Sequence, residues 1–366
     1  MMVSLRSRRK RTPIGLDIGA SGIRAVQLMH TGDRSIVASA ASCECQPNGS
    51  VDSDAVQQPT GYIKKCLRMG EFRGRRAVVA LNPPAAEFHS LELPPTVLAN
   101  QNSDAAQVVR YEVERLANSP SDSVETSHWA LPSTQVSAPN AIGVAAPRDI
   151  LTGMLKTCSD AGLECVRIDT GPTALARFAA TLTSTIAQAV CGVLDVGYGE
   201  ARLVLCVGGV PVLVRRAGPG GRAWTERIAD SLQISARAAE VHKREHGIAL
   251  TGRGIRRAAE AAPGSQIASI LLGALRSQLK ELASEIKRSY EYVLSCYPGR
   301  DVRDLVLVGG GAALGNLPEF LSGALGITVR RASDYLDCES CRLCYTSGNR
   351  QRLEVLASAV GLAAEP

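Results

Sequence analysis

The chain has 366 residues, of which 45% are hydrophobic and 21% charged, so it has room for two domains of ordinary size with real cores. No apolar run approaches the roughly 20 residues that cross a bilayer, and the N-terminal segment lacks the apolar stretch of a signal peptide, so we expect a soluble, cytoplasmic protein. The net charge of +6 is modest, and we expect no nucleic-acid partner.

A basic segment at residues 6–11 begins the chain, and we expect residues 1–11 to form a flexible tail. Such a tail is either solvated or in contact with an anionic surface such as lipid or nucleic acid. The eleven cysteines are an odd number, and several, including Cys158 and Cys191, fall within helix-like or strand-like segments. These are expected to be reduced core residues.

Strand-like and helix-like segments alternate along almost the whole chain. In chain order we expect strands at residues 25–29, 34–42, 76–81, 88–93, 141–146, 165–169, 203–207 and 304–308, and helices at 61–69, 104–116, 148–161, 172–188, from 222, within 235–262, at 266–294, after 318 and at 353–362. This alternation predicts an α/β fold built from layers of helices and sheets.

An internal repeat is the most informative feature. Residues 14–24 and residues 192–202 each contain a buried apolar run that ends in Asp-x-Gly, followed by a small-residue turn and a second strand-like run. Two related halves are therefore expected, each with a hairpin and one carboxylate, Asp17 and Asp195. A carboxylate at a strand tip beside exposed backbone N–H groups suits a phosphate chelated to a divalent cation.

Two further glycine-bearing turns, residues 218–221 and residues 309–311, each precede a helix. Glycine lets backbone N–H groups approach a phosphate, and a helix N-terminus adds partial positive charge. Any one of these turns alone is more often an ordinary tight turn. The four together, in this order, are fairly specific.

Three cysteines follow one another at Cys338, Cys341 and Cys344. Three thiolates suit Zn²⁺, but a closed structural zinc site needs four ligands, and no fourth lies adjacent. Cys43, Cys45, Cys296 or a partner's residue could complete the site; on a helix the three would instead form one buried stripe.

The order of the four turns resembles that of the actin-like ATPase superfamily. The resemblance implies ATP and Mg²⁺ as ligands, with Asp17 and Asp195 ordering the metal shell through water. It assigns phosphates to Gly19, Ala20, Ser21, Gly22, Arg24, Gly197, Tyr198 and Gly199, and the nucleoside to Gly220, Gly221, Glu240, Lys243, Arg244, Gly309, Gly310, Gly311 and Ala312. Glu240, Lys243 and Arg244 would equally suit an ordinary charged helix face.

Within the superfamily the chain is similar to the type IV pilus assembly protein PilM family. The matching segments are residues 17–24, 144–148, 161–164, 174–177, 285–290 and 309–317. The resemblance implies two actin-like (ribonuclease-H-like) halves around a nucleotide cleft. It assigns 12–76, 166–190 and 346–366 to the first half, 77–165 to an inserted subdomain as in FtsA, and 191–345 to the second half, with a helical part at about 233–300.

The PilM resemblance also implies partners. PilM-family proteins are cytoplasmic and bind a short N-terminal cytoplasmic segment of the single-pass membrane protein PilN, which places them at the inner membrane and links them to the pilus motor. A type II secretion machine is the related possibility. The alternatives on the same scaffold are a sugar or small-molecule kinase and a filament-forming FtsA-like protein.

The chain departs from the superfamily at its catalytic position. Many members carry an acidic residue just before the proline of the helix that begins near residue 172, whereas this chain has Gly171. Asp169 is the candidate substitute. Glu200 in the second loop would be unfavourable near a phosphate unless turned away or bound to metal. We therefore expect a slow ATPase or a nucleotide-binding pseudo-ATPase, because losing one positioned catalytic group commonly costs roughly 10²–10⁴-fold in rate.

Overall fold

The computed structural model describes residues 11–44, 59–99, 103–117, 120, 123–134, 139–182, 189–250, 265–345 and 353–364. The basic segment at residues 6–10 and Cys45 lie outside these ranges. Among the described residues, none of the helices combines the length and apolar character that crossing a membrane requires.

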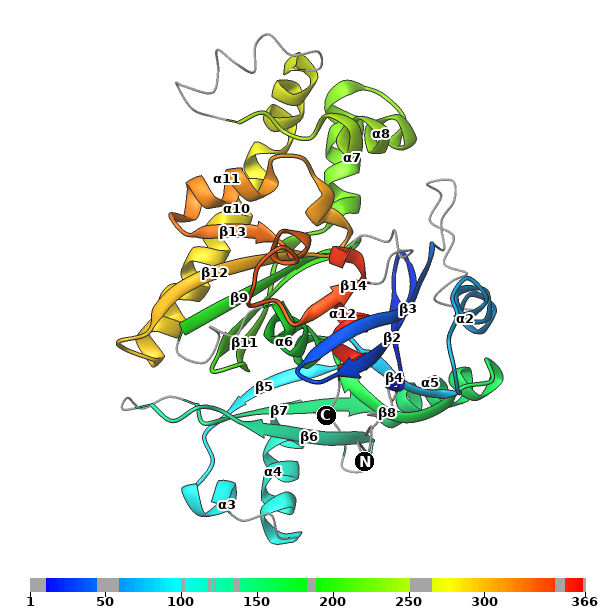
Figure 1. Ribbon diagram of the computed structural model, residues 1–366. Helices are drawn as coiled ribbons and strands as arrows, with labels where there is room; N and C mark the ends of the chain where they lie inside the picture. The colour runs from blue at the N-terminus through cyan, green and yellow to red at the C-terminus, as the bar shows by residue number, and fades with distance from the viewer. Residues whose placement is uncertain are drawn as a thin grey trace, which may run out of the picture.

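Two large sheets share the order of five strands, and one of them has a sixth strand at its edge (Figure 1). The six-stranded sheet runs β14 (Leu343–Tyr345), β3 (Arg34–Glu44), β2 (Gly22–Thr31), β1 (Ile14–Gly19), β4 (Arg76–Leu81), β8 (Glu164–Thr170), and the five-stranded sheet runs β11 (Val210–Pro219), β10 (Glu200–Val207), β9 (Ala189–Val196), β12 (Asp301–Val308), β13 (Thr328–Arg331). In both, three consecutive strands form an antiparallel meander, and two further strands run parallel beside the first. The internal repeat seen in the sequence is thus a repeat of topology.

A third, antiparallel sheet has the order β5 (Glu87–Leu91), β7 (Ala141–Pro147), β6 (Val124–Ala130). Helix α4 (Ser103–Leu116) lies against this sheet, and α3 (Pro95–Ala99) packs on α4 (Figure 1). The expected inserted subdomain began at residue 77, but β4 pairs in parallel with β1 and β8 and so belongs to the six-stranded sheet. Likewise β14, expected in the second half, pairs with β3.

Both large sheets are buried on two faces. Along β12, Leu305 and Leu307 face one hydrophobic cluster, whereas Val306 and Val308 face another, as strand alternation requires. The outer cluster of the five-stranded sheet includes residues of α7 (Gly221–Leu232), α8 (Ala236–His246), α10 (Ser265–Cys296) and α11 (Leu317–Leu325). On the outer side of the six-stranded sheet lie α2 (Pro59–Arg68) and α5 (Arg148–Asp160).

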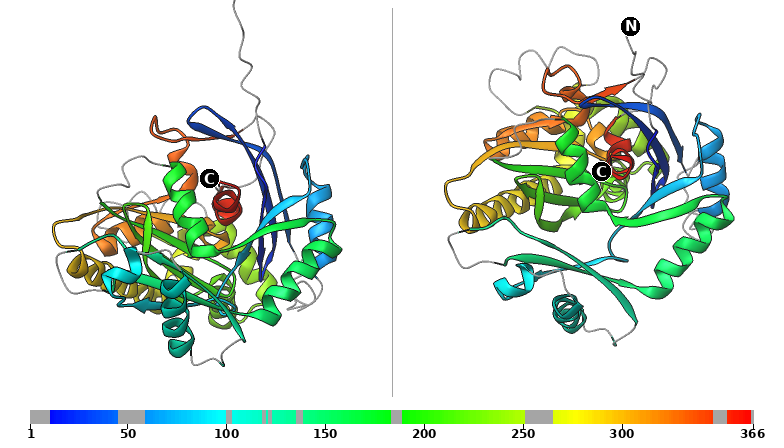
Figure 2. Two further views of the ribbon diagram at one scale, coloured as in Figure 1. Left: turned by 90° about the horizontal axis from the view of Figure 1, so that it is seen from below. Right: turned by 60° about the horizontal axis from the view of Figure 1, so that its bottom comes forward.

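Between the two sheets lie α6 (Gly171–Leu182) and α12 (Leu353–Ala363), side by side in both views of Figure 2. Their cluster combines residues of both sheets, such as Leu28 and Val204, with Phe178 of α6 and Val360 of α12. One shared core therefore joins the two halves.

Glycines allow this close approach. A Cβ atom added to Gly361 would lie 1.8 Å from the Ala174 carbonyl oxygen, and one added to Gly15 would lie 2.1 Å from that of Ala359. Because both obstacles are backbone atoms, neither can move without shifting an element. The positions of β1, α6 and α12 thus depend on the absence of side chains at these two residues.

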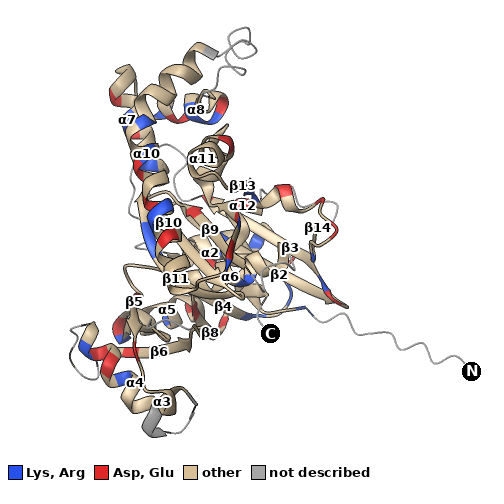
Figure 3. Ribbon diagram, turned by 90° about the vertical axis from the view of Figure 1, so that its left-hand side faces the viewer, with Lys and Arg blue, Asp and Glu red and all other residues tan. Residues whose placement is uncertain are grey.

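Charges of both signs are interspersed along α4, α7, α8 and α10 (Figure 3). Several form ion pairs within a helix, such as Arg110 with Glu114 and Arg288 with Glu285. Opposite charges on these helices are therefore partly compensated by ion pairs within the same helix.

Gly361→Ala should destabilise the protein by about 1–3 kcal/mol or more, because the methyl group forces α12 away from α6. Gly273→Ala is the matched control: Gly273 lies in α10 with open space around it, so alanine should stabilise by roughly 0.5–1 kcal/mol. Thermal unfolding of the two variants checks both signs. Equal melting temperatures would contradict the packing described here.

Candidate functional site

A cavity of about 1440 Å³ lies between the two large sheets. Its lining includes sixteen of the residues expected at the site: Asp17, Gly19, Ala20, Ser21, Arg24, Asp195, Gly197, Tyr198, Gly199, Gly221, Glu240, Lys243, Arg244, Gly309, Gly310 and Gly311. Residues of α5 and α12, including Met154 and Ser358, complete the wall. The fold therefore gathers both Asp-x-Gly hairpins and both glycine turns around one space.

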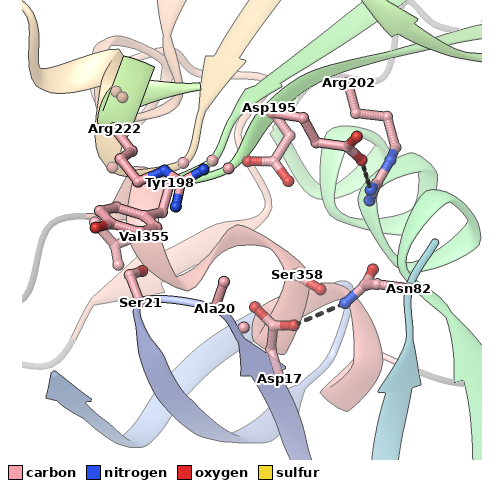
Figure 4. A pocket seen from close by; sticks show the side chains of 18 of the residues that line it. Asp17, Ala20, Ser21, Asn82, Asp195, Tyr198, Arg202, Arg222, Val355 and Ser358 are labelled. Atoms are coloured by element: carbon pink, nitrogen blue, oxygen red, sulfur yellow. Dashed lines mark hydrogen bonds and ion pairs between the residues drawn. The ribbon is translucent and has the colours of Figure 1, made fainter. Parts of the chain in front are cut away.

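The two halves place their carboxylates in equivalent positions. Asp17 lies opposite Arg24 in the β1–β2 hairpin, and Asp195 lies opposite Arg202 in the β9–β10 hairpin. The Asp17 and Asp195 side chains enter the cavity from opposite sides (Figure 4). The repeat thus supplies a pair of acids and, on the neighbouring strands, a pair of arginines.

Burial dominates the electrostatics of both acids. It raises the pKa of Asp195 to about 6, although Arg202 opposes the shift and Asp17 adds to it. Burial also raises the pKa of Asp17, against the opposing influence of Arg24 and a hydrogen bond from Asn82. The protein alone therefore does not compensate these two negative charges fully.

Glu200, expected to repel a phosphate, is turned toward arginine side chains. Its carboxylate forms an ion pair with the largely buried Arg202, and Arg216 Nε lies 3.7 Å from its other oxygen. The negative charge of the second loop is compensated within the protein.

The turn at Gly220 serves a different purpose from the one expected. The backbone N–H groups of Gly220, Gly221 and Arg222 donate to the carbonyl oxygens of Gly199, Gly197 and Tyr198. A Cβ at Gly220 would lie 2.5 Å from the Gly197 oxygen. The start of α7 therefore fixes the second loop, and Gly220 lies behind the cavity wall rather than in it.

Gly309 is needed both for conformation and for space. Its φ of 81° is in the left-handed region, and a Cβ there would lie 2.3 Å from Asp195 Oδ1. Its N–H donates to the Glu354 carbonyl oxygen of α12. Gly22 and Ala312, also expected to hold the nucleotide, lie outside the lining; they belong to β2 and to the short helix η2 (Gly310–Ala313).

Lys243 fixes α8 to α7. Its Nζ donates to the Gly221 carbonyl oxygen at 2.9 Å and to Thr225 Oγ1 at 2.6 Å, and pairs with Glu240 at 2.6 Å. Burial lowers the pKa of Lys243 and Glu240 opposes that shift. Arg244 pairs with the other oxygen of Glu240 at 2.7 Å. The expected nucleoside segment is thus a rigid, mixed-charge wall of the cavity.

A family model described as type IV pilus assembly protein PilM matches residues 15–251. The chain belongs to the PilM family. A solved PilM–PilN type IV pilus biogenesis complex matches with a TM-score of 0.72 and 25% sequence identity, over 97% of this chain and 99% of that one. The expected actin-like fold, two related halves around a cleft, is confirmed.

Two other solved structures are less similar to this chain. The ethanolamine utilization protein EutJ from Carboxydothermus hydrogenoformans is 16% identical with a TM-score of 0.49, over 97% of this chain and 89% of that one. MreB5 of Spiroplasma citri bound to AMPPNP is 15% identical with a TM-score of 0.46, over 95% and 93%.

Asp169 does not line the cavity of this PilM-family protein. Its carboxylate forms ion pairs with Arg177 and Arg167 and accepts hydrogen bonds from Thr173 and Thr170. Burial works to raise its pKa, but these partners outweigh it and the pKa is lowered. Alternate residues of a strand face opposite sides, and Asp169 faces the start of α6. It joins α6 to β8.

Asn82 was not among the residues expected at the site. Asn82 lines the cavity, and its Nδ2 donates to Asp17 Oδ1 at 3.3 Å (Figure 4). No local pattern distinguishes such an amide. Its place follows from the pairing of β4 with β1 and β8.

The structure gives the zinc interpretation no support: among the described residues, no three His, Cys, Asp or Glu side chains are placed to hold a metal ion. Cys341 is buried, with its Sγ 3.5 Å from the Leu343 carbonyl oxygen, and Cys344 lies in β14. Cys338 lies just after the short helix η3 (Ala332–Tyr335), so the three do not share a helix face.

Asp195→Asn should stabilise the nucleotide-free protein near neutral pH. The folded-state pKa of about 6 exceeds the ordinary value of 3.8, so the native state binds the proton more tightly and stability falls as pH rises through this window. The gain in melting temperature should therefore be larger at about pH 7.5 than at about pH 5. A gain that is absent, or that grows toward acid pH, would contradict this electrostatic description.

Proposed function

We propose that this PilM-family protein binds ATP with Mg²⁺ in the cavity and acts as a nucleotide-dependent assembly component of a type IV pilus or related secretion machine. The observation that carries the proposal is the convergence of two repeated Asp-x-Gly hairpins on one cavity, with Asp17 and Asp195 on opposite sides. This arrangement suits one phosphate chain held between two halves.

The residues present fit a magnesium nucleotide. Asp17 and Asp195 carry pKa values raised by burial, so a divalent cation would stabilise their charged forms. These two would order the metal's water shell, while the loops at residues 19–22 and 197–199 would hold phosphates. The nucleoside would lie against Gly221, Glu240, Lys243, Arg244 and the 309–312 turn. The bound cation would neutralise phosphate charge.

Slow hydrolysis follows from what surrounds the acids. Asp169, the candidate base, is held by two arginines outside the cavity, and Gly171 supplies no side chain. An enzyme without a positioned base loses roughly 10²–10⁴-fold in rate. The protein would therefore act through nucleotide-dependent changes of conformation. The lack of a carboxylate base also disfavours a sugar kinase, because that activity needs such a base beside its substrate.

The partner would be the N-terminal cytoplasmic segment of a PilN-like single-pass membrane protein. The similar solved structure is a PilM–PilN complex. Within the described residues, β5 and β6 each pair with β7 alone, so each leaves one edge to which an extended segment can add. Through this partner the protein would lie at the cytoplasmic side of the membrane and couple it to the assembly motor.

Calorimetric titration with ATP, with and without Mg²⁺, tests the nucleotide site. Asp17→Asn should weaken the Mg²⁺-dependent affinity by about 10- to 100-fold, the loss typical of a group that orders a metal's ligands. Asp169→Asn is the matched control; it should lower the melting temperature and leave affinity within about two-fold, because Asp169 lies outside the cavity. Absence of nucleotide binding by the folded, Mg²⁺-containing wild type would overturn the proposal.

Partner docking is tested with a fluorescent peptide of the N-terminal cytoplasmic segment of a PilN-like protein from the same genome. Anisotropy should report saturable binding that MgATP strengthens, because the nucleotide stabilises one arrangement of the two halves. A scrambled peptide is the control. If affinity is the same in every nucleotide state, docking is not coupled to the cleft.

A further inference from the structure

Asn82 and Gly171 occupy one corner of the cavity, at the ends of two neighbouring strands. The parallel pairing of β4 with β8 places Leu81 beside Thr170, so the next residues, Asn82 and Gly171, emerge together at the carboxyl edge of the sheet. Both residues line the cavity.

The two residues compete for the same space. A Cβ atom added to Gly171 would lie 2.0 Å from Asn82 Oδ1 and 3.2 Å from its Cγ. Gly171 is not among the described residues with positive φ, so its backbone does not require glycine. A side chain at 171 would take the volume that the Asn82 amide fills, so the amide could not keep its present position.

The Asn82 side chain is held in a defined direction. Its Nδ2 donates to Asp17 Oδ1 at 3.3 Å across to β1 (Figure 4). Pro83 follows at once, and a residue before proline is restricted to extended backbone conformations. The restricted backbone before Pro83 therefore directs the amide toward Asp17, and the lack of a side chain at Gly171 leaves room for it there.

We infer that Asn82 is a positioning residue of the nucleotide site, which holds the Asp17 carboxylate in place for a divalent cation and depends on glycine at position 171 for its own place. This inference rests on the proposed nucleotide function. An amide accepts no proton near neutral pH, so the group that takes this corner orients an acid and supplies no base.

Two substitutions and their combination test whether Asn82 needs the space left by glycine at position 171. Gly171→Ala should lower the melting temperature while Asn82 is present, and Asn82→Ala/Gly171→Ala should recover most of that loss, because the alanine methyl then has room. If the losses in melting temperature are additive in the double variant, the Asn82 amide does not limit the space at position 171, because residues that compete for one volume do not behave independently.

The role of Asn82 in cation binding is tested by titration of ATP with and without Mg²⁺. Asn82→Ala should reduce the gain in affinity that Mg²⁺ gives by roughly ten-fold or more, the value of one hydrogen bond to a charged group. A merely structural role would not change this ratio. Asn140→Ala is the control, because that half-buried amide bonds the backbone of Leu93 beside the third sheet, away from the cavity.

The outcomes separate the two proposals. A wild type that binds no nucleotide overturns the proposed function. The melting temperatures still decide whether a side chain at position 171 would clash with the Asn82 amide. A wild type that binds MgATP, with an Asn82→Ala variant whose Mg²⁺ gain is unchanged or an Asn140→Ala variant that loses as much, overturns the positioning role.

Discussion

The close contact of α12 with α6 and β1 determines where everything else lies. At Gly361 and Gly15 the backbones approach so closely that a single Cβ would collide with a carbonyl oxygen. This contact joins two sheets of the same topology through one core. Because the sheets meet there, the hairpin tips of both halves, which come from distant parts of the chain, open onto the same cavity.

That convergence has an electrostatic cost. Two carboxylates share a desolvated space, and the folded protein holds both with raised pKa values despite Arg24 and Arg202. Other polar groups of the region are compensated within the chain: Glu200 by Arg202, Glu240 by Lys243 and Arg244. Acids with such perturbed pKa values cluster at functional sites. We interpret Asp17 and Asp195 as acids whose compensation comes from the ligand.

The sequence predicted what short-range patterns carry. Strands with long apolar runs, the amphipathic α10 and both Asp-x-Gly hairpins were recognised close to their observed bounds. β11 was missed because Pro211 and a pair of arginines interrupt its apolar pattern, and β14 because its three residues are defined only by pairing with β3.

The errors at the site have one common origin: each depended on which strand lies beside which. Asp169 was assigned to the cavity, although the alternation of side chains along β8 directs it toward Arg177. Gly220 was assigned to a ligand although its N–H group holds Gly199. Asn82 was overlooked because only the register of β4 and β8 brings it to Gly171. Local sequence specifies the hairpins, whereas the neighbours of their acids are set by long-range pairing.

The central claim is that one metal–nucleotide complex lies between the two halves. Crystals grown with Mn²⁺ and a non-hydrolysable ATP analogue test it directly, because anomalous scattering locates the manganese independently of the nucleotide. The peak is expected between Asp17 and Asp195, within reach of both through its water ligands, with the phosphates against the two hairpin turns. A manganese ion or nucleotide bound elsewhere, with the space between these acids empty, would contradict the claim.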